Sequence, residues 1–235
     1  MTDTIRNEHN QRIGHSVLSW AARSHPSRST MHGRYCRLEM LDSKAHSDSL
    51  YASLGKNPVT DWTYLPYGPF ERANDFKAWL EPQCTQTDPL FYVIVDEVSG
   101  KSLGLASYLR IDANSGVIEV GHIHYAGLLQ RTPLATEAMF LMMQRVFDEL
   151  GYRRYEWKCD ALNERSRNAA LRLGFTFEGI FRQATMYKNR NRDTAWYSII
   201  DSEWPRLKLA YEAWLSPDNF DSGGSQLIRL GDLIK

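Results

Sequence analysis

Short hydrophobic runs through the middle of the chain predict a series of β-strands. RYCRLEML (34–41) alternates apolar and polar residues, as a half-buried strand does. Three longer runs come later, namely LFYVIVDEV, SLGLASYLRI and VIEVGHIHY, and they are joined by the short spacers SGK and DANSG. Spacers of this length that contain Gly or Asn connect neighbouring antiparallel strands. The three runs therefore predict an antiparallel meander.

Helical periodicity surrounds these strands. Two short helices are predicted before the meander, in SKAHSDSLYASLG and FERANDFKAWLEPQ, and a longer one follows it from Pro133 to Leu150. A further helix, NERSRNAALRL, ends at Gly174, which is a favourable residue just past a helix C-terminus. The remaining pattern predicts two antiparallel strands, FTFEGIFRQATMY and DTAWYSIID, around the basic turn KNRNR, and then an amphipathic helix, EWPRLKLAYEAWL.

The order of these elements predicts a mixed α/β (α+β) fold. We expect about seven strands in a mostly antiparallel sheet flanked by helices, with one strand–helix–strand–helix–strand section embedded in it. This domain is predicted to span residues 34–201. Residues 1–33, rich in Ser, His, Arg and Asn, predict an arm without a core of its own, pinned by Trp20. Residues 202–235 predict a C-terminal helix and a polar tail.

Composition narrows the class of protein. The chain has 235 residues, of which 43% are hydrophobic, so it can bury a globular core. Lys plus Arg and Asp plus Glu both number 28, which leaves no long-range field to gather nucleic acid or an anionic membrane. The widely spaced Cys36, Cys84 and Cys159 suit small buried hydrophobes in a reducing compartment. We expect a cytoplasmic protein that binds neither nucleic acid nor membrane, and a homodimer is left open.

The joint between the third meander strand and the following helix is a candidate anion site. AGLLQRT separates the two elements, with Thr132 in position to cap the helix and Pro133 at its first turn. A helix N-terminus carries unpaired N–H groups and about half a positive charge. The amides of Arg131, Thr132, Leu134 and Ala135 are therefore predicted to converge on a phosphate. An ordinary well-capped core helix is the alternative interpretation.

Several motifs in order resemble the GNAT superfamily of acetyl-CoA-dependent N-acetyltransferases. They are EVGHIHY, QRTPLATEAM, ALNERSRNAALRLGF and FEGIFRQATMYKNRNRDTAWYSIID, and the resemblance runs from about Arg34 to Asp201. Within the superfamily the chain most resembles the branch of the ribosomal-protein-alanine N-acetyltransferases. The resemblance implies acetyl-CoA as co-substrate and no metal. It also implies direct attack by a primary amine, either of a small molecule or at a peptide or protein N-terminus.

The resemblance also implies a set of cofactor-binding residues. The family's phosphate motif is Q/R-x-x-G-x-G/A, and here Gln130 and Ala135 match its first and last positions, while Pro133 replaces a Gly. That replacement removes one N–H donor and restricts the approach of the backbone to a phosphate. Asn163 is expected to hydrogen-bond the pantetheine arm, with capping of its helix as the alternative. The expected cofactor-binding residues are Ile123, Tyr125, Gln130, Arg131, Thr132, Leu134, Ala135 and Asn163.

Two residues are expected to act in catalysis. Glu119 matches an acidic position of the family and is the first choice for a base or a contact to the substrate amine, the alternative being a surface carboxylate. Ser166 is expected to protonate the leaving thiolate, because Ala170 stands where many relatives have a Tyr. His122 is predicted on the face of its strand opposite Glu119 and on the same face as His124. No third ligand accompanies the two histidines at a recognisable spacing, so no metal site is predicted.

Two further alternatives stay open at this stage. The loop DWTYLPYGPF precedes the second helix, and its aromatic residues either form a wall for the acceptor or pack on the core. We favour core packing for Trp62 and Phe70 and leave Tyr64 and Tyr67 open. A non-catalytic coenzyme A binding or sensing domain is the alternative function, motivated by Pro133, by Ala170 and by Thr185, where some relatives carry a carboxylate.

Overall fold

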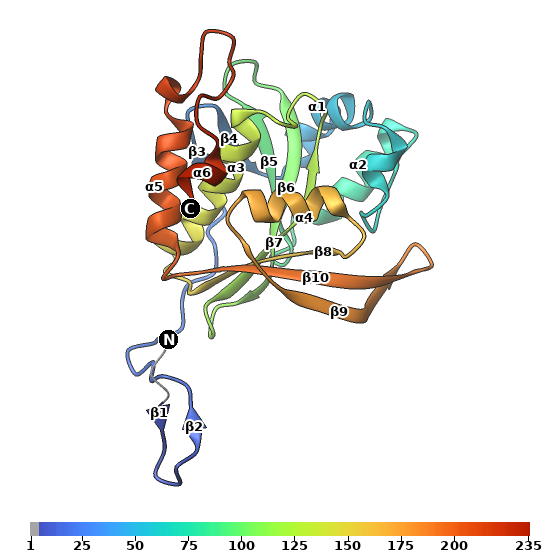
Figure 1. Cartoon of the computed structure of the whole chain (residues 1–235). Helices are drawn as coiled ribbons and strands as arrows, with labels where there is room; N and C mark the ends of the chain where they lie inside the picture. The colour runs from blue at the N-terminus through green and yellow to red at the C-terminus, as the bar shows by residue number, and fades with distance from the viewer. Residues whose placement is uncertain (1–4) are drawn as a thin grey trace.

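An eight-stranded mixed sheet runs through the centre of the molecule (Figure 1). The computed structural model describes residues 5–235. The strand order is β3-β4-β5-β6-β7-β8-β10-β9, and every neighbouring pair is antiparallel except β7 and β8, which run parallel. The strands are β3 (Met31–His32), β4 (Cys36–Met40), β5 (Leu90–Asp96), β6 (Ser102–Asp112), β7 (Val117–Tyr125), β8 (Arg154–Asp160), β9 (Thr176–Tyr187) and β10 (Arg190–Ile200).

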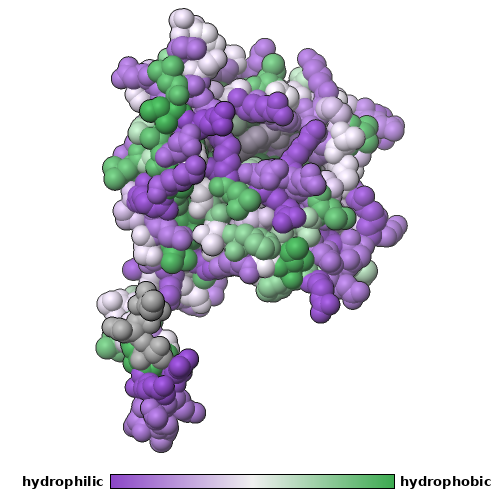
Figure 2. Space-filling view, viewed as in Figure 1, coloured by the Kyte–Doolittle hydropathy of each residue, from purple (hydrophilic) through white to green (hydrophobic). Residues whose placement is uncertain are grey.

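The predicted meander, the second antiparallel pair and the strand–helix–strand–helix–strand section are all confirmed. The sheet has one strand more than the seven expected, because the two-residue β3 lies inside the stretch predicted as an arm. β9 is the last strand of the sheet on one side, and it exposes Phe177, Ile180 and Phe181. Figure 2 shows hydrophobic residues gathered on the face where β9 and β10 lie in Figure 1.

Helices cover both faces of the sheet and enclose two hydrophobic clusters. One cluster lies under α1 and α2 and includes Leu50, Leu80 and Val93. The larger cluster lies under α3, α4 and α5 on the other face and includes Met142 and Tyr155. The α-helices of the domain are α1 (Ser43–Leu54), α2 (Ala73–Gln83), α3 (Pro133–Gln144), α4 (Glu164–Arg172), α5 (Trp204–Leu215) and the short α6 (Leu230–Leu233). The remaining turns are η1 (Val59–Trp62), η2 (Arg145–Glu149) and η3 (Pro217–Asn219).

Two helix ends differ in how closely they follow the prediction. The helix predicted from Pro133 to Leu150 is α-helical only to Gln144, and it continues as the π-helical turn η2. At the end of α4, Gly174 has a φ of +90°, a left-handed conformation that costs Gly no Cβ clash. The predicted helix stop at Gly174 is confirmed.

The N-terminal segment forms a small hairpin that projects away from the sheet (Figure 1). Its strands are β1 (Ile5–Arg6) and β2 (Arg12–Ile13), and their side chains are exposed. Trp20 ties the following residues to the domain, since its indole N–H donates to the Asn114 carbonyl at 2.6 Å. Arg145 then holds the segment before β3, because its guanidinium donates to the Ser29 carbonyl at 2.8 Å.

The C-terminal segment is less polar in its packing than predicted. Leu230 is only 1% exposed and belongs to the larger core cluster, where Leu233 and Ile234 also pack. The expectation of a polar tail was wrong because α6 folds back onto the domain and buries its apolar residues against α5.

No helix among residues 5–235 is long and apolar enough to cross a lipid bilayer.

Candidate active site

An opening between β7 and β8 is the main irregularity of the sheet. The two parallel strands pair over only four residues each: Val117–Val120 of β7 lie beside Arg154–Trp157 of β8. Beyond this point β7 continues to Tyr125 and β8 continues to Asp160, but they no longer pair with each other. Because α3 follows β7 and α4 follows β8, the N-termini of both helices lie at this end of the sheet. Ligands of α/β sheets bind at the carboxyl ends of such diverging strands.

The N-terminus of α3 carries free backbone amides. Thr132 caps the helix, since its hydroxyl accepts from the Ala135 amide at 3.2 Å and donates to the Leu129 carbonyl at 2.7 Å. The amides of Arg131, Thr132 and Leu134 find no acceptor within hydrogen-bond distance among residues 5–235. The amide of Ala135 is taken by the cap and Pro133 has no N–H, so three of the four expected amides remain available to an anion.

Side chains hold the loop before α3 in place, and two of them, Asn57 and Asp61, were not predicted from the sequence. Asn57 donates to the Tyr125 carbonyl at 2.8 Å and accepts from the Gly127 amide at 3.1 Å. The Gln130 side chain also donates to the Tyr125 carbonyl, at 3.1 Å, and to the carboxylate of Asp61, at 3.3 Å. Gln130 therefore shapes the loop with its side chain, and its backbone leads directly into the free amides.

The N-terminus of α4 contains the two residues that the resemblance assigned to pantetheine and thiolate. Asn163 caps the helix by accepting from the Ser166 amide at 3.1 Å. Its side-chain N–H₂ group donates to no acceptor in the described part of the chain, so capping leaves that group available. The Ser166 hydroxyl accepts from the Trp157 indole at 2.9 Å, which leaves its own proton free to be donated.

A β-bulge in β7 changes the predicted orientation of His122. Two residues of β7, His122 and Ile123, lie opposite the single residue Ala106 of β6, and His122 has a φ of +50°. The extra residue breaks the alternation of side chains, so His122 lies on the same face as Glu119. Its imidazole stacks on Tyr67 at 5.7 Å and packs against Phe91 at 5.0 Å. The prediction that His122 lies opposite Glu119 was therefore wrong.

Both histidines of β7 are neutral at pH 7. Burial lowers the pKa of His122 to about 4, and the positive charges of Arg110 and Arg192 add to that effect. Burial likewise lowers the pKa of His124 to about 4, against the opposing charge of Asp61. The two side chains share a face as predicted, with the His124 ring against Trp62 at 4.1 Å. Across residues 5–235, no three His, Cys, Asp or Glu side chains are grouped as metal ligands would be.

Glu119 lies in a buried network of ion pairs. It is 3% exposed, and its carboxylate is 3.0 Å from the Lys158 ammonium and 2.7 Å from the Arg110 guanidinium. Lys158 is also 2.7 Å from Glu156, which pairs with Arg154. Burial raises the pKa of Glu119, and the charges of Lys158 and Arg110 oppose that rise. The alternative of an exposed surface carboxylate is excluded, because the β7 face that bears Glu119 is covered.

The loop between α1 and α2 spans the opening. The Tyr64 hydroxyl donates to the Leu162 carbonyl, just before α4, at 3.0 Å. From the β9–β10 turn, Lys188 donates to the Trp62 carbonyl at 2.8 Å and Arg190 donates to the Thr63 carbonyl at 2.7 Å. The loop therefore bridges two elements that come more than ninety residues later.

The aromatic residues of this loop fall into two groups: Trp62 and Phe70 pack on the core, and Tyr67 presents a buried hydroxyl. Trp62 is 4% exposed and meets Phe70 edge-on at 5.6 Å, so the core-packing interpretation of these two is confirmed. Tyr67 is different, because its hydroxyl is buried and has no hydrogen-bond partner in the described structure. The Tyr67 hydroxyl is therefore an unfilled polar position beside His122.

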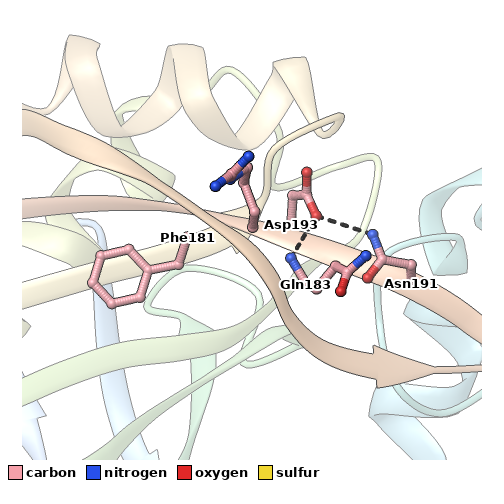
Figure 3. Close-up of a pocket in the computed structure, with 5 residues that line it drawn as sticks. Phe181, Gln183, Asn191 and Asp193 are labelled. Atoms are coloured by element: carbon pink, nitrogen blue, oxygen red, sulfur yellow. Dashed lines mark hydrogen bonds between the residues drawn. The ribbon is translucent and has the colours of Figure 1, made fainter.

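A separate hollow of about 710 Å³ lies along the β9–β10 hairpin (Figure 3). Its lining residues are Phe181, Arg182, Gln183, Asn191 and Asp193. The Asp193 carboxylate accepts from the Gln183 amide at 2.8 Å and from the Asn191 side chain at 3.0 Å, as the dashed lines in Figure 3 mark. Asp193 thus stabilises the hairpin.

The site has two sides, which we name by what each presents. The cofactor side consists of the ends of β7, α3 and α4, with Ile123, Tyr125, Gln130–Ala135, Asn163 and Ser166. The amine side consists of Tyr67, Arg110, Glu119, His122 and Lys158. Sequence reasoning missed Lys158 and Arg110. A lysine beside Trp157 and Cys159 in the strand RYEWKCD was the one available signal, and nothing in the sequence pairs Arg110 with Glu119.

Comparison with known proteins agrees with this geometry. Residues 37–176 match the model of the acetyltransferase (GNAT) domain. A GCN5-related N-acetyltransferase from Brucella melitensis is 48% identical, with 93% of this chain and 99% of that chain aligned and a TM-score of 0.91. This chain belongs to the GNAT acetyltransferase family. It is an acetyltransferase that uses acetyl-CoA as its co-substrate.

Other acetyltransferase structures share the fold at lower identity. One from Chromobacterium violaceum ATCC 12472, described as a GNAT-family acetyltransferase, is 39% identical over 82% of this chain and 96% of that chain, with a TM-score of 0.77. One from Vibrio cholerae, described as a ribosomal-protein-serine acetyltransferase, is 14% identical over 73% of this chain and 97% of that chain, with a TM-score of 0.63. The latter likeness shows the fold alone. None of the curated proteins compared with the chain matches it.

Proposed function

We propose that the protein transfers an acetyl group from acetyl-CoA to a primary amine, of a small molecule or at a peptide N-terminus, by direct attack. The observation that carries this proposal is the opening between β7 and β8. Free amides at the N-terminus of α3 lie on its cofactor side, and the buried carboxylate of Glu119 lies on its amine side.

The cofactor side supplies groups for each part of coenzyme A. The amides of Arg131, Thr132 and Leu134 donate to the pyrophosphate, which the positive end of α3 attracts. Gln130 and Ala135 hold the loop that presents these amides. The backbone of β7 at Ile123 and Tyr125 lies along the pantetheine, and the free side-chain N–H₂ of Asn163 donates to a pantetheine amide.

On the amine side, Glu119 receives the substrate amine. The Arg110 side chain is 62% exposed, whereas the Glu119 side chain is 4% exposed. An incoming ammonium can therefore displace Arg110 into solvent and take its place beside Glu119, while the buried Lys158 stays paired. An alkylammonium with a pKa of about 10.4 has no lone pair, so it must lose a proton before it attacks the thioester. Glu119 accepts that proton.

The departing thiolate is protonated by Ser166. Its hydroxyl proton is free because its oxygen accepts from the Trp157 indole. A covalent acetyl-enzyme on Cys159 has no support, since burial raises the pKa of the Cys159 thiol, and only the thiolate is strongly nucleophilic. The acetyl group therefore passes directly between the two bound substrates: the amine attacks the thioester carbonyl, and the C–S bond to coenzyme A then breaks, without an acetyl-enzyme.

Thiol release from acetyl-CoA against a panel of amines and short peptides tests the proposal. Glu119→Gln is expected to lower kcat by about 10²-fold, the lower end of what a positioned proton acceptor contributes. Glu156→Gln is the matched control, because Glu156 is a buried partner of the same Lys158 on the next strand. Equal losses in the two variants would show that the network matters only for structure. Thiol release that no amine accelerates would contradict the proposed function itself.

A further inference from the structure

The guanidinium of Arg192 on β10 lies 6.0 Å from the centre of the Tyr187 ring but forms no hydrogen bond or ion pair within residues 5–235. Its Nε atom is fully buried with no acceptor in hydrogen-bond distance, and no carboxylate of residues 5–235 pairs with it. Arg192 as a whole is half-buried and only its Nε is fully enclosed, whereas the buried Arg145 and Lys158 pair with Glu149 and Glu119. A buried donor without an acceptor is unfavourable, the more so when it belongs to a charged group. We therefore expect the acceptor for the Arg192 guanidinium to come from a bound molecule.

The carboxylates next to Arg192 are engaged elsewhere. Asp160, which lies opposite Thr194 in the β8–β10 pairing, accepts from the Leu162 amide at 2.9 Å and from the Tyr187 hydroxyl at 2.8 Å. Asp193 follows Arg192 in the chain, and its carboxylate fixes the β9–β10 hairpin. Neither carboxylate reaches the guanidinium, so the positive charge of Arg192 is uncompensated.

Arg192 lies beside the opening on the amine side. β10 pairs with β8 only as far as Thr194 and Asp160, so Arg192 lies beyond the end of β8. Trp196, further along β10, lies with its ring 3.7 Å from the Lys158 ammonium, and Lys158 pairs with Glu119. The charge of Arg192 also helps to lower the pKa of His122. His122 stacks on Tyr67 and lies on the face of β7 that bears Glu119.

Two neutral donors near Arg192 are also unpartnered. The indole N–H of Trp196 is buried without an acceptor, and its ring stacks on Phe181 at 4.4 Å and lies 3.7 Å from the Lys158 ammonium. Burial raises the pKa of Tyr67 well above its usual range, so its buried hydroxyl stays protonated and can donate. These unfilled positions are donors, and a set of donors is satisfied by a group that only accepts, such as a carboxylate.

We propose that the acceptor amine carries a carboxylate on the same small molecule, and that Arg192 pairs with this carboxylate while Glu119 holds the amine. The inference rests on the proposed function and names its substrate class. Free amino acids and related amino-carboxylates have both charges, which complement Glu119 and Arg192. Simple alkylamines lack the carboxylate, and at a peptide N-terminus the adjacent carbonyl is an uncharged amide.

Matched acceptors test this inference in the thiol-release assay. Each free amino acid of a panel is compared with its own α-carboxamide and with the corresponding α-aminophosphonate. In the wild type, kcat/KM for the best acid is expected to exceed that for its amide by at least about 10-fold, since a charge-assisted pair contributes roughly 1.5–3 kcal/mol. An aminophosphonate used better than the acid would overturn the choice of a carboxylate.

Arg192→Met removes the charge and keeps a long apolar side chain. It is expected to lower kcat/KM for the acid by at least about 10-fold and to leave the value for the amide within about twofold. Arg182→Met on the neighbouring β9 is the control, because Arg182 is exposed and forms no ion pair within residues 5–235; it should change neither value. Equal use of acid and amide by the wild type, or equal losses for both in Arg192→Met, would overturn the inference while leaving the acetyltransferase function intact.

A binding readout covers the case in which no acceptor in the panel is turned over. The side-chain N–H signals of Arg192 and Trp196 are assigned by their loss in Arg192→Met and Trp196→Phe, and are then followed by NMR with coenzyme A present. Free amino acids are expected to shift both signals, and their carboxamides are expected to leave them unchanged. Signals that no amino acid shifts would overturn the inference, whereas a lack of turnover with every amine bears on the proposed function.

Discussion

The cofactor side and the amine side of the opening present different kinds of binding group. On the cofactor side the binding groups are backbone amides and two capping residues, Thr132 and Asn163, within two short stretches of sequence. On the amine side they are side chains, most of them buried, from the α1–α2 loop, β6, β7, β8 and β10. Backbone amides can be reproduced by many sequences, whereas buried charges must be matched one by one. We conclude that the cofactor side carries the chemistry common to the family and the amine side carries the choice of substrate.

The largest expected effect tests whether the amine side depends on matched charges. Lys158→Met leaves the carboxylates of Glu119 and Glu156, both buried, without the cation that they share. Removing one member of a buried ionic network costs about 3–5 kcal/mol, so the free energy of unfolding in urea should fall by that amount. Lys208→Met is the control, since its pair with Asp148 is about one-third exposed and should contribute less than about 1 kcal/mol. A similar small loss for both variants would remove the distinction between the two sides.

The next effect concerns the pH dependence of stability, and it arises from His122 and His124. Their pKa is 6.5 ordinarily and about 4 in the folded protein, so between these values the unfolded chain binds protons that the folded chain does not. Stability is therefore lost as the pH falls from 6.5 towards 4, by about 2 kcal/mol per histidine at pH 5. Urea unfolding at pH 7.5 and pH 5 measures this loss. His122→Phe should reduce it by about half, and an unchanged loss would contradict a buried neutral His122.

The smallest effect tests whether the cofactor side works through its backbone. Pro133→Ala restores an N–H to the first turn of α3, and one further hydrogen bond to an anion should tighten acetyl-CoA binding by about 3–10-fold. Calorimetry measures the change, and Pro133→Gly separates the two effects of the proline. If only the glycine variant binds more tightly, the close approach of the backbone matters more than the number of donors. Unchanged affinity in both variants would place the pyrophosphate away from α3.

Most of the fold was predictable because it follows from local patterns. The meander and the two helix N-caps each depend on residues close together in sequence, and the structure confirms them. The predictions failed where one residue shifts a pattern. The bulge at His122 moves its side chain to the other face, and Leu230, in the segment predicted as a polar tail, packs in the core.

The amine side was not predictable in the same way. Glu119 was expected as a candidate, but its pairing with Lys158, thirty-nine positions later, depends on the parallel register of β7 and β8. The unpaired state of Arg192 is visible only once its neighbours have been placed, since KNRNR on its own is typical of a solvated turn. Sequence patterns indicate which residue types are present, whereas charge matching depends on contacts made across the whole fold.

Calorimetric titration of the protein with acetyl-CoA and with acetyl-pantetheine tests the central claim most directly. The two ligands share the thioester and the pantetheine arm, and only acetyl-CoA carries the pyrophosphate that the α3 amides are proposed to hold. We predict micromolar binding of acetyl-CoA and binding of acetyl-pantetheine weaker by at least about 100-fold, because the charge-assisted hydrogen bonds from the three α3 amides are lost. Equal affinities for the two ligands would contradict a pyrophosphate site at the N-terminus of α3.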